Sequence, residues 1–205
     1  MIWIIFVLIA YVCGAIPFSV WLGKLFLHKD VRHFGDGNPG AFNVIKSGNK
    51  TLGIIVLILD ITKAAVPVGL AYNNYEIRGF PMALIAVAPV IGHAYSIFLR
   101  FQGGKAIGTA LGSWIGLTIW ELPLAGLIAT LIGFGILSSP GWAILLGLVA
   151  ILAVLLFWIP DKMLLLVWFV VAIVLIWKHR QDLSQAPKLR SWVLKLKFSL
   201  RKHEL

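Results

Sequence analysis

Long apolar stretches separated by short polar segments run through most of the chain. The stretches cover residues 2–26, 52–72, 81–99, 106–120, 122–137, 142–159 and 162–177. Each is long enough, or nearly so, to cross a hydrocarbon core of about 30 Å as a helix. Because Glu121 and Pro123 interrupt a longer apolar region, a count of six or eight is the alternative. The pattern predicts an all-α polytopic membrane protein with about seven transmembrane helices.

The composition supports this prediction. Of the 205 residues, 60% are hydrophobic and only 13% are charged, which is unlike a soluble domain. The first charged residue, Lys24, stands near the end of the first apolar stretch, after a long apolar run, instead of preceding it. We therefore expect that stretch to be a retained span and not a cleaved signal. The single cysteine, Cys13, lies inside it and has no partner for an intrachain disulfide.

The distribution of the basic residues indicates the orientation. A net charge of +10 would suggest nucleic acid in a soluble protein. Here, however, most Lys and Arg residues fall in 28–50, 100–105 and 178–205, and the opposite side holds only Arg78 and Lys162. Positive residues favour the cytoplasmic side. We therefore predict an external N-terminus, a cytoplasmic C-terminus and no nucleic-acid partner.

The last residues form a basic tail after a single transmembrane domain, which we place at residues 1–180. Within the tail, 181–205, the segment 188–202 carries Leu189, Trp192, Val193, Leu196 and Leu200 at helical spacing among basic residues. It predicts an amphipathic helix on the anionic inner leaflet of the membrane. The alternative is a solvated basic tail with incidental apolar residues.

A glycine-rich loop, "GDGNPGAFN" at residues 35–43, stands out from the apolar pattern. Gly35, Gly37 and Gly40 allow positive φ angles and a close approach of backbone N–H groups to an anion. An ordinary turn is the alternative, since turns use the same residue types. Further candidate phosphate-binding residues in and after the loop are Asp36, Asn38, Asn43 and Lys46.

A second polar cluster lies in "GHAYSIFLRFQGGKAIGTALG" at residues 92–112. Gly103, Gly104 and Lys105 precede a predicted helix, where free N–H groups and the helix dipole favour a phosphate. The motif is not a Walker A sequence, because its earlier glycine and its Ser or Thr are missing. Lys105 and Arg100 could instead be membrane anchors, and His93 a helix-end histidine bonded to a carbonyl.

Two other groups of polar residues complete the candidates. "WKHRQDL" at the end of the last span supplies His179, Arg180 and Asp182 on the predicted cytoplasmic side, which also holds Ser139. Asp60 and Lys63 stand three residues apart inside the second span, so they share one helix face. Since charges at that depth are costly, we expect them to form a structural ion pair and favour this role over direct catalysis.

The ordered motifs resemble those of the bacterial acyl-phosphate:glycerol-3-phosphate acyltransferase family (PlsY type). The family's "GSIPFG", "GSGNxGATNVLR", "LDxxKG", "GHxxPxFxxFKGGKGVATxLG" and "YRHRxNI" are similar to "GAIPFS", "GDGNPGAFNVIK", "LDITKA", the 92–112 segment and "WKHRQDL". The resemblance covers nearly the whole chain up to about residue 185.

The resemblance implies a multi-pass enzyme of the bacterial inner membrane, with its active site facing the cytoplasm. It would transfer a fatty acyl group from acyl phosphate to the 1-hydroxyl of glycerol 3-phosphate, giving lysophosphatidic acid for phospholipid synthesis. It implies no cofactor and no metal. We interpret His93 and Lys105 as the catalytic candidates, with a substrate phosphate as an alternative proton acceptor.

Five positions depart from the family motifs: Asp36, Phe42, Lys46, Gln102 and Asp182. Two of them add a carboxylate to a site for anions, which is repulsive unless a cation neutralises it. The alternatives are therefore a divergent paralogue with another acceptor, or a non-enzymatic lipid-binding membrane protein of the same fold.

Overall fold

A computed structural model describes residues 1–193, and these residues are helical apart from short connections and one isolated β-bridge between Leu137 and Leu189. The α-helices are α1 (Ile2–Ala15), α2 (Phe18–Leu27), α3 (Ala41–Lys46), α4 (Lys50–Gly69), α5 (Gly79–Ala94), α6 (Ile107–Thr118), α7 (Glu121–Ile136), α8 (Pro140–Phe157), α9 (Lys162–Lys178) and α10 (Arg180–Leu183). Short 3-10 turns occupy Val31–His33 and Ile97–Leu99, and a π-helical turn, Leu70–Asn74, continues α4.

Local sequence explains where several helices begin. The Asn49 side chain accepts a hydrogen bond from the Leu52 N–H at the start of α4, and Asp161 does the same for Leu164 at the start of α9. Pro140 occupies the first turn of α8, where its missing N–H costs nothing. The predicted helix boundaries therefore agree with the structure to within a few residues from α4 onward.

The first predicted span is not one continuous helix. It divides into α1 and α2 at Ile16 and Pro17, because proline lacks an N–H and disfavours a helical residue before it. The two parts together still form a segment of 26 residues. Within the described residues, four segments are long and apolar enough to cross a membrane: Ile2–Leu27, Lys50–Asn74, Gly79–Leu99 and Pro140–Phe157.

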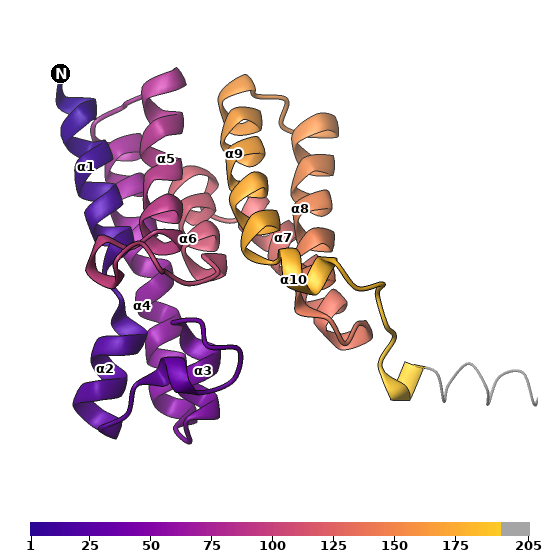
Figure 1. Cartoon of the computed structure of the whole chain (residues 1–205). Coiled ribbons are helices and arrows are strands. Elements are labelled where there is room, and N and C mark those ends of the chain that lie inside the picture. The colour runs from indigo at the N-terminus through magenta and orange to yellow at the C-terminus, as the bar shows by residue number, and fades with distance from the viewer. Residues whose placement is uncertain (194–205) are drawn as a thin grey trace, which may run out of the picture.

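The helices pack in two neighbouring groups (Figure 1). Helix α4 packs mainly against α6 and α1 mainly against α5, while α7 pairs with α8 and α9 contacts both α5 and α8. Gly14 and Gly92 lie at the α1–α5 contact, where a Cβ would collide with the backbone of Pro89 or Tyr11. Small residues let these helices approach closely. Many large apolar side chains point outward, among them Leu8, Leu131 and Val149, as expected for lipid-facing positions.

The start of the tail differs from the predicted amphipathic helix. Residues 188–190 are extended, with Ser138 N–H donating to the Lys188 carbonyl and Arg190 N–H donating to the Ile136 carbonyl. These bonds attach the tail to the turn between α7 and α8 and satisfy backbone groups that a helix would pair internally. Residues 191–193 are helical, as predicted, and the remainder of the predicted helix, residues 194–202, lies outside the described residues.

Candidate functional site

The glycine loop at 35–43 takes the turn conformation that its sequence suggests, with one exception. Gly35 and Gly37 have φ angles of 62° and 76°, in the region that favours glycine. Gly40 has a φ of 172°, which is extended backbone open to any residue. The prediction that all three glycines supply positive φ is therefore wrong for Gly40, because the chain straightens there to enter α3.

The carboxylate of Asp36 sits where the loop was expected to receive an anion. Its Oδ1 accepts hydrogen bonds from the Asn38 N–H at 3.2 Å and from the Asn43 side-chain amide at 2.9 Å. The same amide donates to the Asn38 carbonyl at 2.7 Å, and the Gly37 N–H donates to the Phe34 carbonyl at 3.1 Å. The loop therefore uses these donors internally, around its own carboxylate.

Lys105 lies between two carboxylates from distant parts of the chain. Its Nζ is 3.0 Å from Asp36 Oδ2 and 3.2 Å from Asp182 Oδ2. Burial raises the pKa of Asp36, but the Lys105 ammonium and the hydrogen bonds from Asn38 and Asn43 outweigh burial and lower that pKa from 3.8 to about 2. Both carboxylates that depart from the family motifs thus share one lysine, whose single positive charge offsets only one of the two negative charges.

Three ionisable side chains meet beneath this cluster. Lys63 Nζ lies 2.6 Å from Asp60 Oδ1 and 3.0 Å from His93 Nδ1, and it donates to the Ile16 carbonyl at 2.7 Å. The Lys63 and Asp60 side chains are 4% and 7% exposed. A charged pair this deeply buried requires each partner to remain in place.

The end of α9 joins the cluster through several side chains. Lys178 Nζ donates to the carbonyls of Ala94 and Gly103, both at 3.0 Å, and so fastens the "GGK" segment to α5. The His179 ring is buried, and its Nδ1 lies 2.8 Å from the Leu175 carbonyl. The Arg180 guanidinium stacks on Trp177, with its Cζ 4.7 Å from the ring centroid. Residues near 36, 105 and 180 therefore share one site.

Three cavities surround this cluster, two with a mainly polar lining and the third with a mainly apolar one. One of about 300 Å³ is lined by Asp36, Lys105, His179, Arg180 and Asp182, among others. A second, of about 350 Å³, shares Lys178 and Arg180 with it. A third, of about 100 Å³, shares Asp36 and Lys105 with the first and also contains His93 and Asp60.

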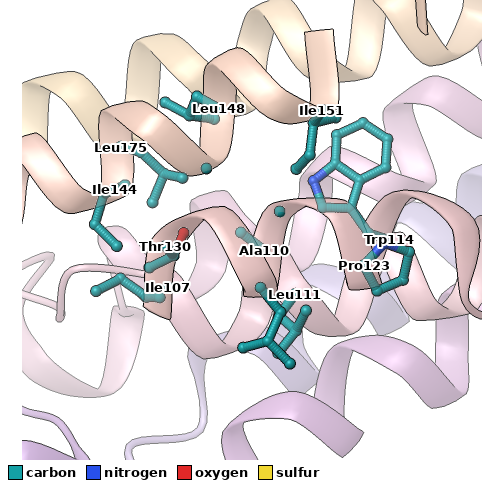
Figure 2. Close-up of a pocket in the computed structure, with 13 residues that line it drawn as sticks. Ile107, Ala110, Leu111, Trp114, Pro123, Thr130, Ile144, Leu148, Ile151 and Leu175 are labelled. Atoms are coloured by element: carbon teal, nitrogen blue, oxygen red, sulfur yellow. The ribbon is translucent and has the colours of Figure 1, made fainter. Parts of the chain in front are cut away.

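An apolar cavity of about 80 Å³ lies beyond them, between α6, α7, α8 and α9. Ile107 lines both this cavity and the one that contains His93 and Lys105. Figure 2 shows Ile107 and Ile144 at one end of the apolar cavity and Trp114 with Pro123 at the other. The site therefore offers a polar compartment that adjoins an apolar one.

Most predicted site residues line these polar cavities, but some do not. Lys46 and Arg100 are exposed and line none of the four cavities described above. Ser139 reaches the site only through its hydroxyl, which donates to the Asp182 carbonyl at 3.3 Å. Sequence reasoning missed Lys178 and Arg32, which both line the cavity of about 350 Å³, since each reads as one more basic residue near a membrane surface.

Comparison with known proteins decides the family. The family model described as glycerol-3-phosphate acyltransferase matches residues 4–188. The chain belongs to the glycerol-3-phosphate acyltransferase family. The resemblance predicted from the motifs is confirmed, and the protein is an acyltransferase of the type that serves phospholipid synthesis.

Individual relatives support this assignment to the family. A glycerol-3-phosphate acyltransferase of Methylobacillus flagellatus is 36% identical over 88% of this chain and 91% of its own length. One of Anaeromyxobacter dehalogenans is 43% identical over 64% of this chain and 67% of its own length. The crystal structure of PlsY (YgiH), an integral membrane glycerol 3-phosphate acyltransferase, in its glycerol 3-phosphate form has a TM-score of 0.82, with 27% identity over 90% of this chain and 91% of that one. The predicted all-helical, membrane-embedded fold is confirmed.

Proposed function

We propose that the protein transfers a fatty acyl group from acyl phosphate to the 1-hydroxyl of glycerol 3-phosphate. One observation carries this proposal: the polar cavity around Lys105 shares that lysine with a mainly apolar cavity, which in turn shares Ile107 with the apolar cavity of α6 to α9. An acyl phosphate has a charged head and a long apolar chain, which are the two chemistries that these compartments match. The polar cavities also leave space for a second phosphate-bearing substrate.

The reaction makes one ester bond and breaks one acyl phosphate bond. The 1-hydroxyl oxygen attacks the acyl carbonyl carbon, the bond from that carbon to the phosphate oxygen breaks, and a substrate phosphate receives the hydroxyl proton. Lys105, Lys178 and Arg180 supply the positive charge that holds the phosphates and stabilises the departing one. Positioning of the two substrates and this electrostatic stabilisation account for the rate.

The proposal includes an orientation in the membrane. We place the site at the cytoplasmic face of the bacterial inner membrane, with about seven spans, an external N-terminus and a cytoplasmic C-terminus. The charge distribution supports this placement, because Arg78 and Lys162 are the only Lys or Arg residues on the opposite side. The basic tail, 181–205, would then face the anionic inner leaflet.

A second candidate acceptor follows from the two carboxylates on Lys105. Asp36 and Asp182 occupy part of the positive charge that a phosphate would use, and carboxylates accept hydrogen bonds from hydroxyl groups. An acceptor with more hydroxyl groups and less negative charge than glycerol 3-phosphate would suit such a site.

The test uses purified protein in detergent with palmitoyl phosphate as donor. Glycerol 3-phosphate and glycerol are offered separately, and phosphate release and the acylated product are measured. Lysophosphatidic acid formed from glycerol 3-phosphate supports the proposal. Acylation of glycerol in preference to glycerol 3-phosphate supports the second acceptor class, and no product with either acceptor refutes the proposed reaction. Palmitoyl-CoA in place of the acyl phosphate is the donor control.

A further inference from the structure

The end of α7 carries backbone carbonyl groups that its own helix does not pair. The last carbonyls of an α-helix lack an intrahelical N–H partner and need a donor from elsewhere. A glycine in the left-handed conformation often closes such an end, but here Leu137 follows in an extended conformation, with φ of −99° and ψ of 144°. The carbonyls at the end of α7 therefore depend on another part of the chain.

The tail supplies the missing donors. The Arg190 N–H donates to the Ile136 carbonyl at 2.9 Å, and Arg190 Nε donates to the Leu137 carbonyl at 3.1 Å. Trp192 Nε1 donates to the Gly135 carbonyl at 3.0 Å. The Arg190 guanidinium also places a positive charge at the negative end of the α7 dipole. Two residues of the tail thus complete the end of a helix that lies more than 50 residues earlier in the chain.

Further hydrogen bonds extend this attachment over residues 184–192, which we call the strap. The Ser138 N–H and hydroxyl donate to the Lys188 carbonyl at 2.9 and 3.0 Å, and Trp142 Nε1 donates to the Gln185 carbonyl at 2.9 Å. The strap runs past the turn between α7 and α8 (Figure 1). The family match ends at residue 188, so Arg190 and Trp192 lie beyond the part of the chain that the family shares.

The turn that the strap holds is the free end of the α7–α8 pair. The connections to α6 and α9, at residues 119–120 and 158–161, both lie at the opposite end of the pair. At the turn, Gly141 packs so closely on α10 that a Cβ would collide with Asp182, and the Ser139 hydroxyl donates to the Asp182 carbonyl at 3.3 Å. Among the described residues, the strap therefore makes most of the hydrogen bonds that fasten this end.

The position of α7 and α8 determines the shape of the apolar cavity. Eight of its thirteen lining residues belong to these two helices, so a shift of the pair changes its width. Thr130 and Ile144 line it near the turn, at the same end as Ile107 (Figure 2). Ile107 also lines the cavity that contains Lys105. The strap thus fastens the end at which an acyl chain would enter from the polar site.

We propose that Arg190 and Trp192 are positioning residues for the acyl donor, because through the strap they hold the free end of α7 and α8 at the entrance of the apolar cavity. This inference rests on the proposed function and deepens it. A gap of only about 0.5–1 Å between an acyl chain and the cavity wall forfeits roughly a quarter to a half of each dispersion contact. Loosening the turn should therefore weaken the binding of a long acyl chain and leave a short one unaffected.

Amide hydrogen exchange tests the strap without reference to catalysis. The full chain in lipid nanodiscs is compared with Arg190→Gln and with Trp192→Phe, which removes the indole N–H and keeps an aromatic ring. Lys188→Gln is the matched control, because within residues 1–193 Lys188 bonds to the turn through its carbonyl alone. We expect the amides of residues 137–139 to exchange about 2- to 10-fold faster in the first two variants and at the wild-type rate in the control. Unchanged exchange in both Arg190→Gln and Trp192→Phe overturns the proposal.

Kinetics separate a positioning role from a purely structural one. Palmitoyl phosphate and butyryl phosphate are compared as donors at saturating glycerol 3-phosphate. Combining Arg190→Gln with Trp192→Phe should raise the KM for palmitoyl phosphate roughly tenfold and leave the KM values for butyryl phosphate and glycerol 3-phosphate nearly unchanged. Arg190→Lys should recover part of the loss, because it keeps a charge at the end of α7. Equal changes with both donors, or faster exchange with an unchanged KM, would make the strap purely structural and overturn the positioning role.

A non-reactive ligand keeps the test independent of turnover. Hexadecylphosphonate has a charged head and a long chain but lacks the acyl phosphate bond that breaks. It should slow amide exchange along α7 and α8 in the wild type, and the double variant should need a roughly tenfold higher concentration for the same protection. No acylated product from the wild type would refute the proposed function, whereas no protection, or equal protection in both proteins, would refute the positioning role. If the double variant does not fold, the two single variants decide the proposal, because each removes its own donor.

Discussion

Removing either carboxylate from Lys105 should strengthen the binding of glycerol 3-phosphate. Asp36→Ser and Asp182→Asn each free one side of the Lys105 ammonium, which lies 3.0 and 3.2 Å from the two carboxylates. A substrate phosphate then no longer competes with that carboxylate for the lysine. Each change also removes a negative charge close to a bound phosphate.

The structure sets the size of the effect. The pKa of Asp36, held at about 2 in place of 3.8, bounds the stabilisation of its charged form at about 2.4 kcal/mol. Since the Asp36 side chain is 46% exposed, solvent screening reduces the part of this free energy that a bound phosphate could recover to about 1 kcal/mol. We therefore expect the KM for glycerol 3-phosphate to fall roughly fivefold in each variant, with kcat nearly unchanged.

The assay measures phosphate release at a saturating acyl phosphate concentration over a range of glycerol 3-phosphate. Asp161→Asn is the matched control, because it removes the same charge at the far end of α9 and keeps an N-cap side chain. The gain should shrink at high salt. If both variants instead raise KM or lower kcat, the carboxylates belong to the mechanism or to recognition of another acceptor, and the reasoning fails.

The ion pair also has a defined pH dependence. Because the folded-state pKa of Asp36 lies below 3.8, its contribution to stability is complete above that pH and is lost as the pH falls toward 2. The difference in Tm between the wild type and Asp36→Asn should therefore stay constant from pH 5 to pH 8. A difference that changes across this range would contradict the assigned pairing.

Three further predictions concern the loop, the lysine and the topology. Gly37→Val should abolish turnover in a folded protein, because its φ of 76° disfavours a β-branched residue; normal activity would make the loop a mere connector. Lys105→Ala should lower kcat/KM by about 10- to 100-fold, and Lys105→Arg should restore only part of it; near-normal kcat/KM in the alanine variant would make the lysine an anchor. With Cys13→Ser, cysteines at Asn38 and Asn74 should label from the cytoplasm and the outside respectively, and external labelling at 38 would refute the orientation.

The positions of the helices followed from the sequence because their causes are local. Apolar runs of membrane length, bounded by proline, glycine or charged residues, predict α4 to α9 to within a few residues. The motifs also identified most segments that line the site, since glycine pairs and clustered polar residues are unusual beside a bilayer. The division between α1 and α2 is caused by Pro17, whereas the continuous apolar run of residues 2–26 predicts a single span.

What only the tertiary structure decided was which of these residues meet. The sequence marks Asp36 and Asp182 as unusual carboxylates in an anion site, yet their shared partner, Lys105, emerges only when the ends of α6 and α9 come together beside the glycine loop. The contact between His93 Nδ1 on α5 and Lys63 Nζ on α4 likewise forms only because these two helices pack together. Hydropathy and turn chemistry act over a few residues, whereas ion pairs and side-chain hydrogen bonds between helices depend on how closely the helices approach, and packing alone determines that approach.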